Sequence, residues 1–296
     1  MTQLEALREA GRIASRARVF GQALIVAGAK VRDVCQAVDD EIARLGGALA
    51  FPTQSSRNAV AAHHCPGPDD HDLYGDGDLA KLDLGVHLEG HVVDTATTVN
   101  VGDAPSNRPL VEAAVAALGA AIGTAGPDVP IERLSQAIAR EIEGRGLRSM
   151  KNLCGHGVGR YVVHCPPPIP NSVVEGASGV LRQGMVVAIE PFATDGPGEV
   201  REGDTAEVFR VPPQREWAPG LDAEVFEAIR AFQGLPFGRR QLGGLPRQRV
   251  DDTLRALWTR GWLAAYPPLI EAAGHMVAQA EHTIYVGEGG VEVLTA

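Results

Sequence analysis

The sequence predicts an α+β fold that is made of two similar halves and carries a helical insertion. A helical pattern at 31–46 returns 100 residues later, at 131–146, and strand-like segments follow both copies. A stretch of different composition then interrupts the chain at about 196–270. The 296 residues suffice for one large domain or two small ones, and we expect a single domain over 1–296.

Both copies of the repeat have apolar residues at helical spacing, and both end at a glycine. A long helical segment precedes each copy, at about 3–28 and about 107–124. This order predicts helix, helix and sheet twice, over about 1–103 and 106–195. Two unrelated amphipathic helices can share such a pattern by chance, but the matched order of their neighbours favours a true repeat. The matching positions are Val31 and Ile131, Val34 and Leu134, Gln36 and Gln136, Ala37 and Ala137, Val38 and Ile138, Glu41 and Glu141, Ile42 and Ile142, and Gly46 and Gly146.

The region at about 196–270 is rich in glycine, proline and arginine, with helical patterns near 221–233 and 250–264. Strand-like sequence returns at 274–287. We interpret 196–270 as an insertion, after which the last segment of the chain rejoins the main sheet.

The composition is that of an ordinary globular protein, with 45% hydrophobic and 22% charged residues. A net charge of −10 without a basic block argues against direct binding of nucleic acid. The four cysteines form no Cys-x-x-Cys pair, which suits a reducing compartment. The N-terminus has no signal-peptide pattern, and no apolar stretch is long enough for a membrane span. We therefore expect a cytoplasmic protein without membrane contact.

Two aspartates lie eleven residues apart in one apolar stretch, although aspartate is depleted in strands. The stretch divides at Glu89-Gly90, which fits a two-residue hairpin turn. That turn pairs Gly85 with Asp94 and puts Asp83 on the same face, as a diagonal neighbour of Asp94. The two carboxylates can then converge on one cation, for which Gly85 leaves room. Two solvated aspartates on an exposed strand face are the alternative.

Further candidate ligands lie in or beside strand-like segments. His156 is flanked by glycines, and Glu190 and Glu281 both lie in or at the end of an apolar strand pattern. Alone, each is compatible with an exposed strand-end carboxylate or a hydrogen-bonded core histidine, but several such sites in one chain make independent explanations less satisfactory. A second pair, His63 and His64, follows Phe51-Pro-Thr, where a surface loop is the alternative.

These motifs, in this order, resemble the methionine aminopeptidases of peptidase family M24. The resemblance covers nearly the whole chain, and its strength comes from the shared order rather than from any single motif. The motifs are Phe51-Pro-Thr, Asn58-x-x-Ala-Ala-His63, Asp83-x-Gly, Asp94, Gly155-His156-Gly-x-Gly, Ala188-Ile-Glu190-Pro-Phe and Glu281-His-Thr-Ile.

The resemblance implies the pita-bread fold, whose two pseudo-symmetric halves agree with the repeat. The 91 residues from Glu190 to Glu281 are more than type I enzymes have there, whereas type II enzymes carry a helical insertion at this point. The region 196–270 therefore resembles the type II insertion. The chain begins almost directly at the catalytic domain, without the charged extension of eukaryotic type II enzymes, and so resembles the archaeal form.

The resemblance also implies a site for two divalent metal ions. Asp94 and Glu281 would bridge the ions, Asp83 would hold one of them, and His156 with Glu190 would hold the other. Four carboxylates and one neutral imidazole carry a charge of about −4, which two divalent cations balance. An oxygen-rich set with one histidine suits Co, Mn, Fe(II) or Zn with open coordination, unlike a closed zinc site of cysteine and histidine.

The family's catalytic and substrate-binding positions fall on a further group of residues. By resemblance, Glu190 relays a proton from the attacking water to the leaving amine. His63 and His164 match the two histidines that contact the scissile peptide group and stabilise the tetrahedral intermediate. Phe51 and Val163 lie where the family lines its pocket for the methionine side chain.

The resemblance therefore implies removal of the initiator methionine from nascent polypeptides, with a preference for a small second residue. It also implies a monomer that meets its substrates near the ribosome. An Xaa-Pro dipeptidase of the same fold is the nearest alternative, although such enzymes usually carry an additional N-terminal domain that this chain lacks. A metal-free relative that only binds other molecules is another alternative, but such relatives have lost ligands that this chain keeps.

Three cysteines lie close to the motif histidines, namely Cys65, Cys154 and Cys165. Cys154 stands where polar residues are more usual. A thiol near two metal ions can bind or oxidise, but we expect these side chains to be small buried hydrophobic groups.

Overall fold

The computed structural model describes residues 1–174 and 179–296. The first half begins with helices α1 (Gln3–Leu24) and α2 (Val31–Arg44), and the second with α3 (Arg108–Thr124) and α4 (Ile131–Glu143). Strands follow each helix pair, so the predicted order of helix, helix and sheet is confirmed in both halves. Short 3-10 turns, η1 (Val101–Asp103) and η2 (Pro105–Asn107), connect the halves.

Helix α1 shows how local sequence sets these elements. The Thr2 hydroxyl accepts from the Glu5 backbone N–H, and the Glu5 carboxylate accepts from the Thr2 backbone N–H, which forms a capping box. The helix ends at Leu24, four residues earlier than expected, because the next residue, Ile25, turns into an extended conformation and is buried.

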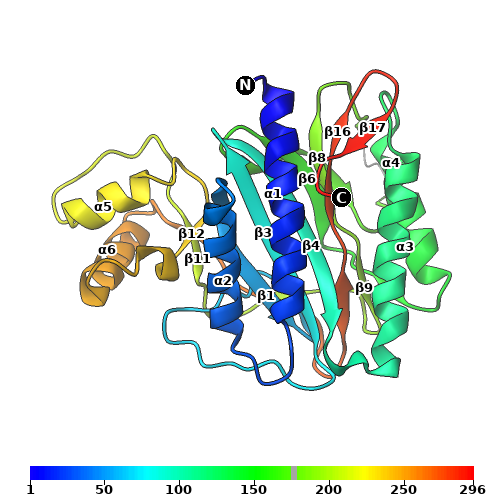
Figure 1. Ribbon diagram of the computed structural model, residues 1–296, viewed down its shortest axis with the longest axis horizontal. Coiled ribbons are helices and arrows are strands. Elements are labelled where there is room, and N and C mark those ends of the chain that lie inside the picture. The colour runs from blue at the N-terminus through cyan, green and yellow to red at the C-terminus, as the bar shows by residue number, and fades with distance from the viewer. Residues whose placement is uncertain (175–178) are drawn as a thin grey trace.

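The first-half strands form an antiparallel sheet in the order β1 (Ala48–Arg57), β3 (Leu79–Leu88) and β4 (His91–Asn100). Helices α1 and α2 pack on this sheet, in front of it in Figure 1. The short strand β2 (Val60–Ala62) leaves the sheet and pairs with the region that follows the second half. Its position matters because it leads directly into His63.

The second-half strands form two sheets with the last segment of the chain. One has the order β17 (Val291–Val293), β16 (His282–Val286), β8 (Val186–Ile189), β6 (Cys154–Gly159) and β7 (Val162–Pro170). The other has the order β15 (Val277–Gln279), β9 (Phe192–Thr194) and β5 (Arg148–Ser149). Helices α3 and α4 pack against these sheets, at the right of Figure 1. As expected, the last segment of the chain rejoins the sheet, through β15 and β16.

The part of the chain between β9 and β15 has an apolar cluster of its own. This cluster is formed largely by α5 (Ala223–Arg230), α6 (Arg247–Thr259) and their connections. It stands apart from the sheets at the left of Figure 1. Helix α6 stops short of the expected end at 264, because Gly261 has a φ of +66° and terminates the helix. The other elements are β10 (Arg201–Glu202), β11 (Val208–Arg210), β12 (Phe237–Gly238), η3 (Arg239–Leu242), β13 (Ala264–Tyr266) and β14 (Leu269–Ile270).

A buried ion pair joins this region to the first half. Arg240 Nη1 lies 2.8 Å from Asp39 Oδ2 on α2, and both side chains are almost fully buried. The pair also holds strand β1: the Thr53 N–H donates to Asp39 Oδ1 at 3.1 Å, and Arg240 Nη2 donates to the Thr53 carbonyl at 3.2 Å.

We expect Arg240→Met to lower the free energy of unfolding by about 3–5 kcal/mol, because the Asp39 carboxylate would remain buried without its partner. Urea unfolding of the two proteins measures the difference. The double variant Asp39→Leu with Arg240→Met should recover most of the loss, since it buries no unpaired charge. Equal stability of Arg240→Met and the parent protein would contradict the expectation.

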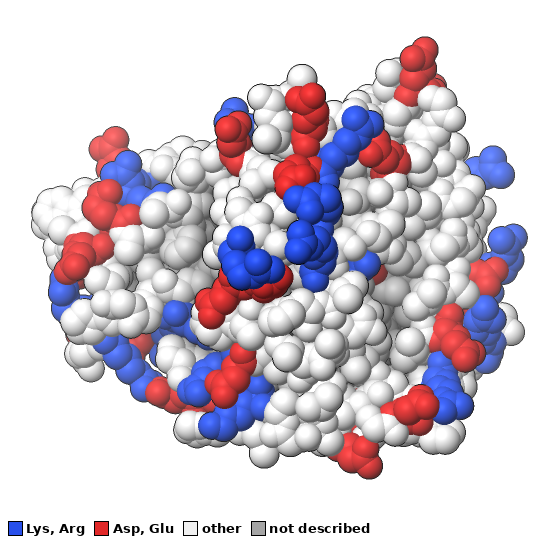
Figure 2. Space-filling view, viewed as in Figure 1, with Lys and Arg blue, Asp and Glu red and all other residues white. Residues whose placement is uncertain are grey.

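Charged side chains of both signs lie next to one another on the face shown in Figure 2, rather than gathering by sign. Examples are the ion pairs of Arg8 with Glu292 and of Arg12 with Glu9. None of the helices in the described part of the chain combines the length and the apolar character that a membrane crossing needs.

Candidate metal centre and active site

The hairpin of β3 and β4 places the first two carboxylates as expected. Glu89 and Gly90 both have positive φ, which is typical of a tight two-residue turn, and the resulting register pairs Gly85 with Asp94. Asp83 therefore lies on the same face of the sheet as Asp94. The role expected for Gly85 is wrong, however. A Cβ atom there would lie 2.3 Å from Cε1 of Phe51, so the missing side chain makes room for that ring and not for a cation.

Threonine side chains along the seam between the two halves bring Glu281 to Asp94. The Thr283 hydroxyl accepts from the Asp94 N–H and donates to the Asp94 carbonyl, both at 2.7 Å. The Thr95 hydroxyl donates to the Glu281 carbonyl at 2.9 Å, and the Glu281 N–H donates to the Ala96 carbonyl at 3.0 Å. Residues 187 positions apart in the chain are thus fixed side by side.

His156 and Glu190 come from neighbouring strands of the second half. His156 on β6 pairs with Ala188 on β8, two residues before Glu190. The Asn171 side chain donates to the Glu190 carbonyl and accepts from the Phe192 N–H, which fixes the chain on both sides of Pro191. His156 Nε2 then lies 3.5 Å from Glu190 Oε1 and 3.7 Å from Asp94 Oδ2.

One cavity of about 330 Å³ collects every site residue that the sequence predicted. Its lining includes the five candidate ligands and the four residues expected to contact substrate. These residues are Phe51, His63, Asp83, Asp94, His156, Val163, His164, Glu190 and Glu281.

Burial shifts the pKa values of the carboxyl groups in this cavity. It raises the pKa of Asp83 to about 7, and it raises the pKa values of Asp94, Glu190 and Glu281 well above their ordinary range, with neighbouring carboxylates adding to the effect. Three carboxylate oxygens have no hydrogen-bond partner among the described residues: Oδ1 of Asp83, Oδ1 of Asp94 and Oε1 of Glu281. Such an arrangement favours the binding of cations, which would neutralise the carboxylates.

His156 completes this set as a neutral ligand. Burial lowers its pKa to about 3. Its Nδ1 lies 3.2 Å from the Gly157 carbonyl, which can only accept, so Nδ1 carries the proton and Nε2 keeps its lone pair. Ligand atoms of Asp94, His156 and Glu281 all lie within 4.8 Å of one another. Oxygen donors with one imidazole fit divalent transition-metal ions, which would also supply the missing charge.

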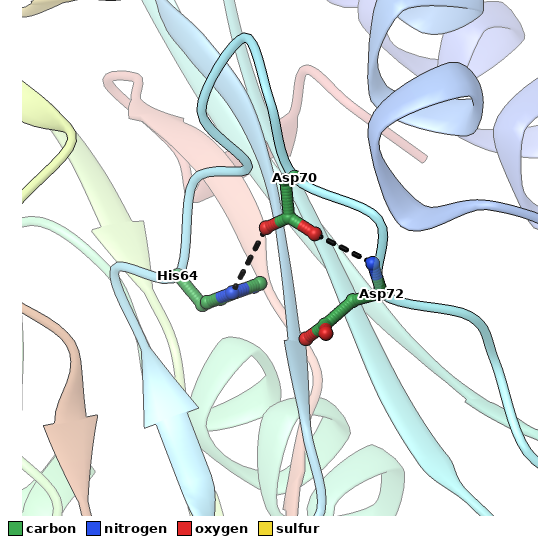
Figure 3. Close-up of side chains that lie close together, drawn as sticks. All are labelled: His64, Asp70 and Asp72. Atoms are coloured by element: carbon green, nitrogen blue, oxygen red, sulfur yellow. Dashed lines mark hydrogen bonds and ion pairs between the residues drawn. The ribbon is translucent and has the colours of Figure 1, made fainter.

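A second cluster consists of His64 with Asp70 and Asp72 (Figure 3). None of the three lines the cavity. Its groups already have partners. His64 Nδ1 lies 2.8 Å from the Ser55 carbonyl, Asp70 accepts from the Asp72 N–H at 2.8 Å, and the Asp72 carboxylate pairs with Arg57. The cluster therefore has no need of a cation, and His63 rather than His64 lines the candidate active site.

The structure corrects the expectation for the cysteines at one position. Cys65 is buried and Cys165 partly so, but Cys154 is exposed and lines the cavity. Cys154 begins β6 opposite Pro170, so it lies at the end of the sheet rather than within the core.

Several cavity residues were missed in the sequence. Val208, Pro236 and Tyr266 come from the region between Glu190 and Glu281, where no local motif marks them. Gln54 lies only three residues after Phe51, but strict strand alternation would place the two on opposite faces.

Comparison with known proteins agrees with this arrangement. The family model described as "Metallopeptidase family M24" matches residues 5–210. The chain belongs to this family. Among its members, the chain is 38% identical to a methionine aminopeptidase of Archaeoglobus fulgidus over 98% of both proteins. It is 39% identical to a methionine aminopeptidase of Pyrococcus horikoshii over 99% of both. The resemblance to archaeal methionine aminopeptidases is thereby confirmed, and this M24 peptidase is a metallo-aminopeptidase.

Several solved structures share the fold at lower identity. Methionine aminopeptidase of Thermotoga maritima superposes with a TM-score of 0.73 at 24% identity, covering 99% of this chain and 96% of that one. A thermophilic Arx1 gives 0.86 at 16% identity, covering 98% and 90%. Prolidase of Pyrococcus furiosus gives 0.62 at 20% identity, covering 99% and 64%. The predicted pita-bread fold is confirmed, and the methionine aminopeptidases match this peptidase better than the prolidase does.

Proposed function

We propose that this chain is a cytoplasmic enzyme with two divalent metal ions that removes initiator methionine from new polypeptides with a small second residue. The observation that carries the proposal is the set of four carboxylates around one neutral imidazole, inside a cavity that also has an apolar wall. Asp94 and Glu281 are buried, and Asp83 and Glu190 are partly buried. We also infer that residues 1–296 act as one catalytic domain, with 196–270 as an insertion that contributes Val208, Pro236 and Tyr266 to the cavity.

The residues that would hold the metals follow the order of the motifs. Asp94 and Glu281 would bridge two ions, of Co, Mn, Fe(II) or Zn, while Asp83 would bind one ion, and His156 with Glu190 the other. Bound divalent cations supply polarisation of the scissile carbonyl and a lower pKa of the attacking water.

The other residues would bind the substrate and move its protons. Phe51 and Val163 are buried apolar residues of the cavity wall, and they would contact the methionine side chain. Glu190 would accept the proton of the attacking water and pass it to the leaving amine. His63 and His164 would contact the scissile peptide group and stabilise the negative charge that develops on its oxygen. The substrate is the N-terminus of a new polypeptide, and we place the monomeric enzyme near the ribosome.

The test is hydrolysis of peptides by metal-stripped protein, with and without added Co or Mn. We expect release of methionine from Met-Ala-Ser only with metal, release from Met-Phe-Ser slower by about tenfold or more, and no cleavage of Ala-Pro. Equal rates on the two methionine peptides would contradict the small-residue preference. Cleavage of Ala-Pro alone would favour a dipeptidase, and no cleavage of any peptide by metal-bound protein would favour a binding role.

A further inference from the structure

A bulge in strand β1 turns two of its side chains into the same cavity. Phe51 lies opposite Gly85 and Gln54 lies opposite Asp83, so three residues of β1 span two residues of β3. Gly85 and Asp83 share one face of the sheet, and the extra residue therefore puts Phe51 and Gln54 on that face together. Both side chains line the candidate active site. Bulges often redirect a side chain next to an active site in this way.

The bulge is held from outside the sheet by the buried ion pair of Asp39 and Arg240. Both backbone groups of Thr53 are bound by this pair, at the residue just before Gln54. A buried ion pair is often no more stabilising than apolar residues of similar volume. Its position here therefore indicates a role in holding the backbone conformation of residues 52–54. The side chain that benefits directly is that of Gln54.

Gln54 is the one amide of the cavity lining whose oxygen lacks a partner among the described residues. The side chain is only 5% exposed, and its Oε1 has no hydrogen bond. The other amide, Asn152, donates to the Val200 carbonyl and accepts from the Val200 N–H. A buried polar atom without a partner costs roughly 1–3 kcal/mol. A ligand in the cavity that donates a hydrogen bond to Gln54 Oε1 would remove this cost.

We propose that Gln54 Oε1 accepts a hydrogen bond from the N-terminal amino group of the substrate. This inference rests on the proposed function. The amine nitrogen of a peptide lies about 2.5 Å from the carbonyl carbon of the first residue, so the amine of a residue about to be released must lie close to the metal ligands. The α-amino group has N–H donors in both its neutral and its protonated form.

Gln54 suits this role because its side chain is neutral as well as close to the candidate metal ligands. The neighbouring carboxylates of Asp83, Asp94 and Glu281 would be engaged with metal ions. A neutral amide beside them adds an acceptor without adding repulsion. An N-terminally blocked peptide lacks these donors, so binding by Gln54 would favour substrates with a free N-terminus.

The test compares two inhibitors that differ only in the amine, L-methionine and its desamino analogue 4-(methylsulfanyl)butanoate. Inhibition constants are measured against Met-Ala-Ser with metal-loaded protein. We expect the parent protein to bind methionine more tightly than the analogue, and Gln54→Met to reduce that preference by roughly tenfold or more. The methionine side chain in Gln54→Met is similar in length to glutamine and has no amide, so the variant keeps the buried volume. Gln36→Met, on the surface of α2, is the control and should leave the preference unchanged.

Three results would overturn the inference. An unchanged preference in Gln54→Met would show that the amide does not bind the amine. Equal weakening of both inhibitors would assign Gln54 to packing if metal content is retained, and to metal binding if it falls. Failure of the parent protein to cleave Met-Ala-Ser would overturn the proposed function itself, whereas cleavage with an unchanged preference would overturn only the role of Gln54.

Discussion

Replacement of Glu281 by glutamine is expected to lower kcat/KM for Met-Ala-Ser by about a thousandfold or more, which corresponds to about 4 kcal/mol of transition-state stabilisation. Glutamine keeps the shape of the side chain but removes the charge that the proposed bridging role needs. The metal content of the purified variant should fall together with its activity. Steady-state kinetics and metal analysis measure the two effects.

The fold should survive this change. Burial raises the pKa of Glu281, and the neighbouring carboxylates add to the shift, so replacing this acid by a neutral amide removes a group whose charge is disfavoured there. In the presence of a chelator, Glu281→Gln should therefore melt at the same temperature as the parent protein or higher. The exposed Glu288 offers a matched control, since Glu288→Gln should change neither activity nor metal content. Full activity of Glu281→Gln would refute the bridging assignment.

The hairpin of Asp83 and Asp94 was predictable because its geometry is local. A two-residue turn fixes the register of both strands, and a period of two fixes the face of each side chain. The meeting of Asp94 with Glu281 was not predictable from such rules. It depends on the Thr95 and Thr283 hydrogen bonds across the seam of the two halves. The order of family motifs supplied what local geometry lacked.

The missed and mistaken residues share a physical cause. Gln54 was missed because a bulge held by Arg240, from a distant part of the chain, breaks the alternation of β1. Tyr266 reaches the cavity from the region before the last strands, which no short pattern connects with the site. Gly85 was given the wrong role because the position of the Phe51 ring depends on the same bulge. Tertiary contacts decide each of these positions.

Removal of metal is expected to destabilise the protein, and more strongly at pH 8.5 than at pH 6.5. Burial raises the pKa of Asp83 to about 7 and shifts Asp94, Glu190 and Glu281 upward as well. In the metal-free protein, the folded state therefore holds protons that the unfolded state has released. The free energy of unfolding falls as pH rises wherever the folded state binds more protons. All four shifts have the same sign, so their effects on the free energy of unfolding add.

The buried histidines act in the opposite direction but in a different range. The pKa values of His63 and His156 are lowered to about 4 and about 3, so these side chains cost stability only as pH falls below their unfolded value of 6.5. Lys81, Cys35 and Cys65 are also buried and have shifted pKa values, but they lie outside the candidate metal centre and contribute equally with and without metal. The difference between urea unfolding with chelator and with added Mn, between pH 6.5 and 8.5, therefore reports on the carboxylates. Metal-free Glu281→Gln should show a shallower slope, because one of the raised groups is gone. A stability that chelation leaves unchanged across this range would mean that the four carboxylates do not depend on a cation for their charge.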